Sequence, residues 1–209
     1  NAHYNLGMTF YKSNQLKKAK SFFKKTVDIQ NNFAVAFFWL ANCHAELKEY
    51  NDAISCYQKS LEINPNLVIA YNNLGLVFNS INDFDNAISS FKSAVKIKPN
   101  HAGAYHNLAL TFKNLGKFDE AIEAYQKAIN INPDYAKSYN NMGAILQEQG
   151  KLYEAIETYK KGLTINPDDV VLIENFLLLE TQLEHTENIN KQLRDILSKQ
   201  HIRLKERPK

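Results

Sequence analysis

Primary amides recur along this chain at intervals that are multiples of 34 residues. The members of this Asn column are Asn5, Asn73, Asn107, Asn141 and Asn175. A carboxamide offers two N–H donors and a carbonyl acceptor, which matches the alternating N–H and C=O groups of an extended peptide main chain. The column therefore predicts a surface that binds peptide backbone with little regard to side chains. The alternative, left open by the sequence, is that these amides bond neighbouring repeats of the protein to one another.

The elements that must position these amides follow from the same period. Four prolines share it: Pro65, Pro99, Pro133 and Pro167. When each repeat is numbered so that this proline is residue 32, position 20 is always alanine: Ala19, Ala53, Ala87, Ala121 and Ala155. Position 8 alternates between glycine and alanine, and position 24 is always aromatic. Small and apolar residues at helical spacing, repeated every 34 residues, predict an array of closely packed helix pairs.

Two stop signals delimit the helices within each repeat. Position 15 is expected to end the first helix, and it holds Asn14, Lys48, Asn82, Gly116 and Gly150. All of these except Lys48 are residue types that tolerate the left-handed conformation at a helix end. The second helix is expected to end before each proline, because proline disfavours helical geometry in the residue that precedes it. The sequence thus predicts an all-α fold, a solenoid of tandem helix-turn-helix repeats.

These columns resemble the signature of the tetratricopeptide repeat family, in which aromatic, Leu, Gly, aromatic, Ala, aromatic, Ala and Pro follow in order. The stretches AYNNLG at 70–75 and FDEAIEAYQKAININPD at 118–134 carry the resemblance most closely. It implies a right-handed α-solenoid that holds peptides or partner proteins in a concave groove lined by the first helix of each repeat. The Asn column is similar to the asparagine-lined superhelix of the nucleocytoplasmic O-linked N-acetylglucosamine transferases.

The period divides the chain into predicted units. Five repeats are expected at residues 1–33, 34–67, 68–101, 102–135 and 136–169. Beyond them the pattern decays, since Ile189 stands where every earlier repeat has alanine. We expect a degenerate sixth helix pair or cap at 170–200 and a basic tail or linker at 201–209. Because Asn1 already occupies the second position of a repeat, the chain is interpreted as a fragment of a longer array.

The first helix of each repeat is expected to present a ligand-binding face at positions 2, 5, 6, 9, 12 and 13. Residue types vary there from repeat to repeat, while the packing columns do not vary. Besides the Asn column at position 6, the predicted peptide-binding residues are Asn72, His106 and Asn140, all at position 5. This face is polar and carries few charges, which favours a neutral polar ligand.

The second repeat departs from this pattern because Phe38 and Trp39 replace polar residues at positions 5 and 6. Together with Tyr4, Met8 and Tyr11, they are expected to form an exposed aromatic anchor for a partner. The alternative is that preceding repeats or a neighbouring copy of the protein cover these side chains.

Composition and motifs exclude several classes of function. A net charge of only +3, with both signs dispersed, gives no electrostatic footprint for nucleic acid. Cys43 and Cys56 lack the paired spacing of a zinc or redox site and are expected to be free thiols. Phosphate-binding, zinc-protease and nucleophile-elbow motifs are absent from the sequence, so we expect no cofactor, metal or catalytic residues in this chain. We expect no membrane span, and the cytoplasm is the default location.

These observations favour a protein–protein interaction module that binds an extended peptide or a partner protein. One alternative is the substrate-recognition arm of a larger enzyme, such as a glycosyltransferase or sulfotransferase, with catalysis beyond Lys209. Another is self-assembly into a homo-oligomer through the end repeats. The role of a chaperone adapter is disfavoured, because Phe38, Gly103 and Asn107 stand where the carboxylate-clamping basic residues of such adapters would lie.

Overall fold

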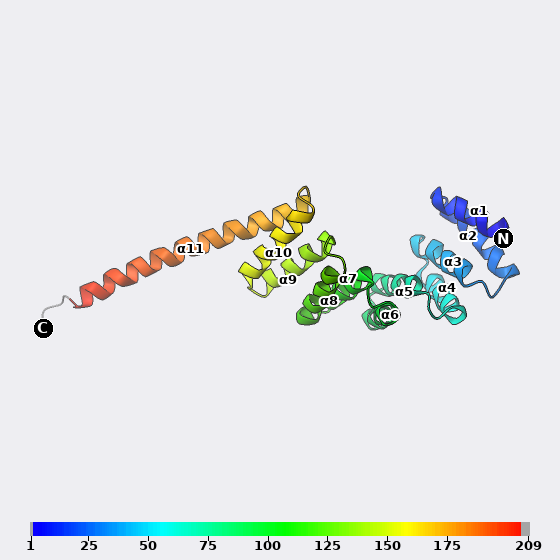
Figure 1. The fold of residues 1–209 in the computed structure, drawn as a ribbon, viewed down its shortest axis with the longest axis horizontal. Helices are drawn as coiled ribbons and strands as arrows, with labels where there is room; N and C mark the ends of the chain where they lie inside the picture. The colour runs from blue at the N-terminus through cyan, green and yellow to red at the C-terminus, as the bar shows by residue number, and fades with distance from the viewer. Residues whose placement is uncertain (1, 206–209) are drawn as a thin grey trace. The chain divides into compact units, whose positions relative to one another are not determined.

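The computed structural model describes residues 2–205, and for residues 189–190 and 192–205 it describes the backbone alone. Over this range all regular structure is α-helical (Figure 1). The helices are α1 Ala2–Lys12, α2 Leu16–Ile29, α3 Ala34–Glu46, α4 Tyr50–Ile63, α5 Val68–Ser80, α6 Phe84–Ile97, α7 Ala102–Asn114, α8 Phe118–Ile131, α9 Ala136–Glu148, α10 Leu152–Ile165 and α11 Val170–Lys205. Each odd-numbered helix up to α9 packs against the helix that follows it. The predicted all-α fold of tandem helix pairs is therefore confirmed.

The chain forms two compact units, Asn1–Asn132 and Pro133–Lys209. In the first unit α3 also packs on α2, α5 on α4, and α7 on α6, so each of the four helix pairs packs on the next. In the second unit α11 packs on α10. The sequence, which predicts an uninterrupted array, gives no sign of this boundary. The Asn132-Pro133 dipeptide there is the same as the Asn-Pro dipeptides at two other repeat ends.

The turns inside the repeats form by the predicted mechanism. Backbone φ at position 15 is positive in all five repeats, from 59° at Asn14 and Asn82 to 74° at Gly150. Lys48 adopts this conformation too, at 62°, although its side chain does not favour it. In the fourth repeat, the N–H of Lys117 then donates to the carbonyl of Phe112 at 2.9 Å, a hydrogen bond that closes the end of the helix.

Small residues allow the two helices of a repeat to approach closely. The five alanines of position 20 are all 0 % exposed, as the tight packing predicted for this column requires. At position 8, a Cβ built on Gly75 would lie 2.6 Å from Cε1 of Phe91, and one on Gly143 would lie 2.5 Å from Cε1 of Tyr159. The aromatic ring of position 24 therefore rests directly on the backbone of the facing helix.

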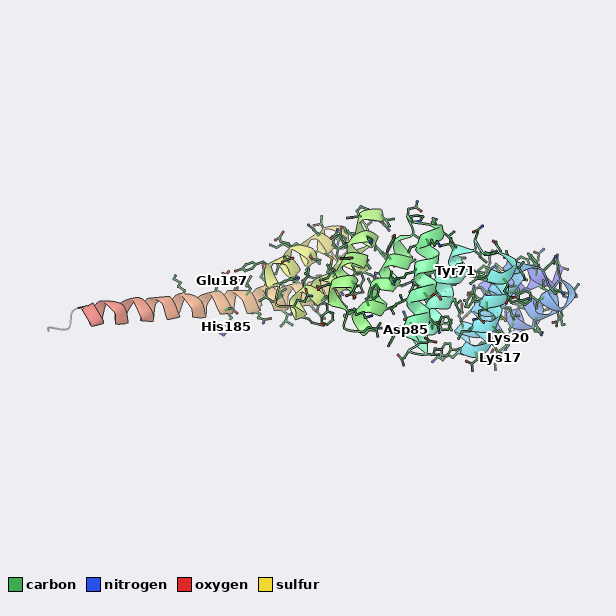
Figure 2. The ribbon with its side chains drawn as sticks, turned by 90° about the horizontal axis from the view of Figure 1, so that it is seen from below. Lys17, Lys20, Tyr71, Asp85, His185 and Glu187 are labelled. Carbon is green, nitrogen blue, oxygen red and sulfur yellow. The ribbon has the colours of Figure 1, made fainter. Side chains whose placement is uncertain are left out.

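The predicted sixth helix pair is wrong. Residues 170–205 form one continuous helix, α11, in which Glu184 occupies position 15. Glutamate has no preference for the left-handed conformation, and no glycine lies in this region, so nothing in the local sequence ends the helix there. Early in α11, Leu172 and Leu179 are 0 % exposed, and Glu187 accepts a hydrogen bond of 2.8 Å from the hydroxyl of Tyr153 (Figure 2). The side chain of Ile189 and residues 206–209 of the predicted basic tail lie outside the described part of the chain.

Candidate functional site

Side-chain amides in the first unit form a hydrogen-bonded relay that crosses three repeats. Asn107 on α7 donates from Nδ2 to Oδ1 of Asn72 on α5 at 2.9 Å. Asn72 donates to Oδ1 of its neighbour Asn73 at 3.3 Å, and Asn73 donates to Oδ1 of Asn42 on α3 at 3.1 Å. The same oxygen of Asn42 accepts a hydrogen bond from the hydroxyl of Tyr57. We call these five residues the amide relay.

The second unit repeats one step of the relay in the same register. Asn175 on α11 donates from Nδ2 to Oδ1 of Asn140 on α9 at 2.9 Å. In both units, position 6 of one repeat thus bonds position 5 of the repeat before it. Asn73 cannot follow this rule, because Phe38 at position 5 has no acceptor, and it bonds Asn42 at position 9 instead.

The inter-repeat interpretation of the Asn column therefore holds at Asn73, Asn107 and Asn175. Each of these amides uses one of its two N–H groups in the bond, which leaves the second N–H for a ligand. Asn5 is exposed on α1 and Asn141 is partly exposed on α9, and the structure brings neither into these bonds. Binding of peptide main chain by the column remains a prediction, as does its likeness to the asparagine-lined transferases.

The exposure predicted for His106 is wrong. The side chain is 7 % exposed, and its ring packs edge-on against Tyr125 on α8, with centroids 5.4 Å apart. Phe38 behaves in the same way, since it is 5 % exposed and its ring lies 6.0 Å from that of Tyr57. In both repeats a ring at position 5 turns inward onto the tyrosine of position 24. An aromatic or imidazole ring at position 5 was the sequence signal that both side chains belong to the core.

The aromatic side chains predicted as one patch only partly share a cavity. Tyr4 packs against Phe23 and Phe33, with ring centroids 5.8 and 5.2 Å away, and Met8 lies against the same cluster. Tyr11 and Trp39 also contact this cluster, and their rings pack edge-on at 4.9 Å. Of the five predicted anchor residues, Tyr11, Phe38 and Trp39 line a common cavity, whereas Tyr4 and Met8 do not.

This cavity has a volume of about 520 Å³ and lies between α1, α3, α4 and α5 in the first unit. Its aromatic wall consists of Tyr11, Phe38, Trp39, Tyr50 and Tyr57. Ile69 and Leu76 on α5 add an aliphatic wall, and both are large apolar side chains exposed by 49 % and 40 %. The wall also includes Asn42 and Asn73, so the amide relay ends at the cavity. The volume falls within the range of ligand pockets, about 300–1,000 Å³.

The polar edge of the cavity is set by Glu46 on α3. Its Oε1 accepts a hydrogen bond from the hydroxyl of Tyr11. Burial, together with this hydrogen bond and the nearby carboxylate charge, raises the pKa of the Tyr11 phenol well above its usual range. Burial likewise raises the pKa of Tyr57. Both phenols therefore remain protonated donors at neutral pH.

The sequence predicted the repeat positions that form this site, but it did not identify every residue that lines the cavity. Leu76 and Asn42 stand at position 9, Ile69 at position 2 and Glu46 at position 13, all of which belong to the predicted ligand-binding face. The sequence did not single out these residues, because Asn42 lies outside the amide columns of positions 5 and 6 and the other three are neither amides nor aromatic. Tyr57 at position 24 could not be found in this way, since that column predicts core packing.

A second cavity, of about 440 Å³, lies within the second unit. It is lined by residues of α9, α10 and α11, among them Gln147, Glu148, Asn175 and Gln182. Gln147 accepts a hydrogen bond of 3.3 Å from the hydroxyl of Tyr159. Amide side chains dominate its polar wall, whereas aromatic rings dominate the wall of the cavity in the first unit.

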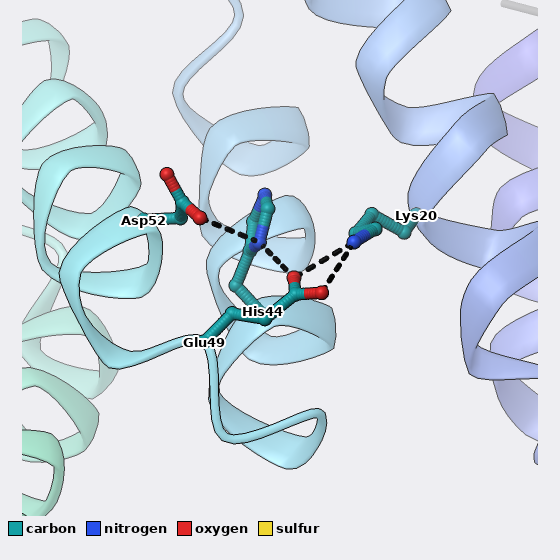
Figure 3. Close-up of polar contacts among 4 residues, drawn as sticks. All are labelled: Lys20, His44, Glu49 and Asp52. Carbon is teal, nitrogen blue, oxygen red and sulfur yellow. Dashed lines mark hydrogen bonds and ion pairs between the residues drawn. The ribbon is translucent and has the colours of Figure 1, made fainter.

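Charged side chains cluster in the second repeat, around the turn between α3 and α4. The atoms of His44, Glu49 and Asp52 that could bind a metal ion lie within 4.8 Å of one another (Figure 3). His44 Nδ1 is 2.6 Å from Glu49 Oε2 and 3.9 Å from Asp52 Oδ2. Lys20 on α2 donates to both oxygens of Glu49 at 2.7 Å, and this hydrogen bond lowers the pKa of the Glu49 carboxyl. A metal ion would have to displace the lysine ammonium, so the cluster is best explained by an ion pair between Lys20 on α2 and Glu49, the residue that precedes α4.

The two cysteines match the expectation of buried or partly buried free thiols. Cys43 is buried and Cys56 is partly buried. Burial raises the pKa of the Cys43 thiol to about 12 and that of the Cys56 thiol to about 11. Thiolate chemistry at neutral pH is disfavoured at both positions, because the thiolate is the nucleophilic form. In the described residues, no helix has the length and apolar character that a membrane span requires.

Comparison with known families agrees with the repeat pattern. Models of the tetratricopeptide repeat match residues 1–33, 34–67, 68–101 and 136–169, and two further models of the same repeat match 90–123 and 112–150. Together the matches extend over residues 1–169. No curated protein matches the chain.

Solved structures share this fold. The crystal structure of MamA protein is 26% identical, with a TM-score of 0.73, and the match covers 79% of this chain and 91% of that one. YrrB, described as a TPR protein with an unusual peptide-binding site, is 21% identical over 82% of this chain and 89% of its own, with a TM-score of 0.69. For pilF of Pseudomonas aeruginosa the identity is 19%, the coverage 98% and 96%, and the TM-score 0.77. At these identities, the likeness to YrrB and pilF shows a common fold alone.

Proposed function

The chain belongs to the tetratricopeptide repeat family, and we propose that it is a protein-interaction module that binds an extended segment of a partner protein. The face that receives the segment is formed by α1, α3, α5 and α7 of the first unit. Repeat arrays of this kind are typically scaffolds, and their function lies in the surface that stacking creates.

The observation that carries the proposal is the cavity at which the amide relay ends. Ile69 and Leu76 are exposed there beside Trp39, which is only partly buried. Apolar side chains of this size are rarely grouped on a surface without a partner, and aromatic residues in such a group are frequent anchors of binding. The cavity offers a place for one side chain of the segment.

The amide relay supports main-chain binding next to that anchor. Asn73 lies in the cavity wall and Asn107 one repeat further along, each with a second amide N–H beyond the one used between repeats. Their inter-repeat bonds hold the two amides in place, so little side-chain entropy is lost when a ligand binds. A peptide in the extended conformation would present carbonyl oxygens to these donors.

A backbone-methylated peptide tests this function directly. The probes are a pool of degenerate heptapeptides and a second pool, of the same composition, that carries N-methyl groups on alternate residues. Trp39 is the only tryptophan of the chain and lies in the cavity wall, so its fluorescence reports occupancy. We expect the unmethylated pool to bind at least about tenfold more tightly, because the N-methyl groups block the close approach of the main chain that its carbonyl oxygens need to reach the two amides.

The cavity itself is tested by a matched pair of variants. Leu76→Lys places a positive charge in the cavity wall, whereas Ile81→Lys places the same charge on a side chain of similar exposure, 39 %, outside the wall. We expect the first variant to lose binding and the second to keep it, with unchanged circular dichroism for both. Failure of every pool to bind the native protein, or full binding by Leu76→Lys, would overturn the proposal.

A further inference from the structure

We propose that the cavity of the first unit selects peptides that place an arginine in it. This inference rests on the peptide-binding function proposed above and concerns the same cavity. It follows from the combination of one negative charge, a wall of aromatic rings and an aliphatic flank.

The charge comes from Glu46. Among the described residues that line the cavity, it is the one side chain that carries a full charge at neutral pH. Glu46 is exposed, and only its Oε1 receives the hydrogen bond from Tyr11. The second carboxylate oxygen is therefore available to a ligand at the cavity edge, and the local charge is not neutralised by a neighbouring lysine or arginine in the wall. A cationic ligand is favoured and an acidic one is disfavoured.

The rings extend this preference from charge to shape. The Tyr11 and Trp39 rings pack edge-on at 4.9 Å, and Trp39 packs edge-on against Phe38 at 5.2 Å. Aromatic faces attract cations, and the planar guanidinium of arginine also stacks on them, which the compact ammonium of lysine does not do. Glu46 is one hydrogen bond away from the Tyr11 ring, so a guanidinium near these rings lies within reach of the carboxylate.

The aliphatic flank suits the stem of the same side chain. Ile69 and Leu76 present exposed methyl groups to the cavity, against which the three methylenes of arginine can be buried while its head stays polar. Leucine or isoleucine in the ligand would gain the apolar contact but leave Glu46 unused. Glutamate in the ligand would bring a second negative charge to the same edge. Of the side chains compared, arginine is the one that uses all three features of the wall.

The experiment compares three heptapeptide pools that differ only in the fixed central residue: arginine, leucine, or citrulline, the neutral isostere of arginine. Binding to the native chain is followed by Trp39 fluorescence. We expect the arginine pool to bind about tenfold more tightly than the citrulline pool, since hydrogen bonds to charged groups are worth roughly 1.5–3 kcal/mol and each tenfold is about 1.4 kcal/mol. The preference should weaken as salt is raised, because the site is open to solvent.

Two isosteric variants assign the preference to Glu46. Glu46→Gln should equalise the arginine and citrulline pools, while Glu123→Gln, an exposed position on α8 outside the cavity, should retain the difference. Circular dichroism establishes that both variants stay folded. Equal binding of all three pools to the native chain, or an arginine preference that survives in Glu46→Gln, overturns arginine selection while leaving peptide binding intact. If no pool binds at all, the proposed function fails together with this inference.

Discussion

Asn107 and Asn72 are joined across a repeat boundary by a hydrogen bond of 2.9 Å between Nδ2 of the first and Oδ1 of the second. Asn175 and Asn140 repeat the same bond at 2.9 Å in the other compact unit. The stability of a repeat array is a sum of terms within repeats and between nearest neighbours. These amides therefore serve the interface between repeats, and any ligand must use the hydrogen-bonding capacity that remains.

A double-mutant cycle measures this link. Asn107→Ala and Asn72→Ala are each expected to lower the free energy of unfolding by about 0.5–1.5 kcal/mol. The double variant should lose less than the sum, since both substitutions remove the same bond between Asn107 and Asn72. Urea unfolding followed by circular dichroism provides the values. Asn114→Ala, an exposed position on the same helix, should change little. Strict additivity of the two variants would show that the bond adds no stability.

Overpacking tests the alanine of position 20. Ala121 is 0 % exposed between α7 and α8, so Ala121→Leu is expected to cost roughly 1–3 kcal/mol of unfolding free energy. Glu123→Leu introduces the same side chain at an exposed position of the same helix and should stay within about 0.5 kcal/mol of the native chain. Thermal unfolding of both variants measures the difference in stability. Equal melting temperatures would show that Ala121 does not lie in a tightly packed interface.

Alkaline pH should destabilise the first unit through its thiols. The pKa values of about 11 for Cys56 and about 12 for Cys43 lie above the ordinary value of about 8.5 expected in the unfolded chain. A pKa raised by folding contributes stability that is complete below the unfolded value and is lost as pH rises through the folded value. We expect unfolding free energy to fall between about pH 8.5 and 12.

Replacing both cysteines by alanine should flatten that pH dependence, whereas the native protein should show the full slope. Urea unfolding across the pH range measures it. Tyr11 and Tyr57, whose pKa values are also raised, leave a residual slope above about pH 10 in the variant. A variant with the native slope from pH 8.5 to 10 would contradict the assignment to the thiols.

Acidic pH should weaken the ion pair between Lys20 on α2 and Glu49 at the start of α4. The hydrogen bond from Lys20 lowers the pKa of Glu49, so the stability it contributes is present above the unfolded pKa and is lost as pH falls through the folded one. Lys20→Met should therefore reduce the change of stability between about pH 5 and 3. The effect should be small and sensitive to salt, because Lys20 and Glu49 are partly exposed. Lys59→Met, at an exposed pair within one helix, is the control.

The sequence by itself determined the repeat, its two helices and its packing columns. The period of 34, the alanines and the residues of position 15 report local geometry and close helix contact, which follow from residue types that recur at a fixed spacing. Lys48 shows the role of the repeat position most clearly. Lysine does not favour the left-handed conformation, but Lys48 stands at position 15 and adopts it, with φ of 62°. The array imposes the turn because the following helix must pack back onto the first.

Tertiary structure alone decided which residues share a site. Phe38 and His106 stand at the same position as Asn72, yet their rings turn into the core because a tyrosine of position 24 lies beneath them, while Asn72 stays partly exposed. The bond from Asn73 to Asn42 and the meeting of Tyr11 with Glu46 join residues more than 30 positions apart. Such contacts depend on how the side chains of neighbouring repeats pack against one another. A periodic pattern in the amino-acid sequence does not contain that information.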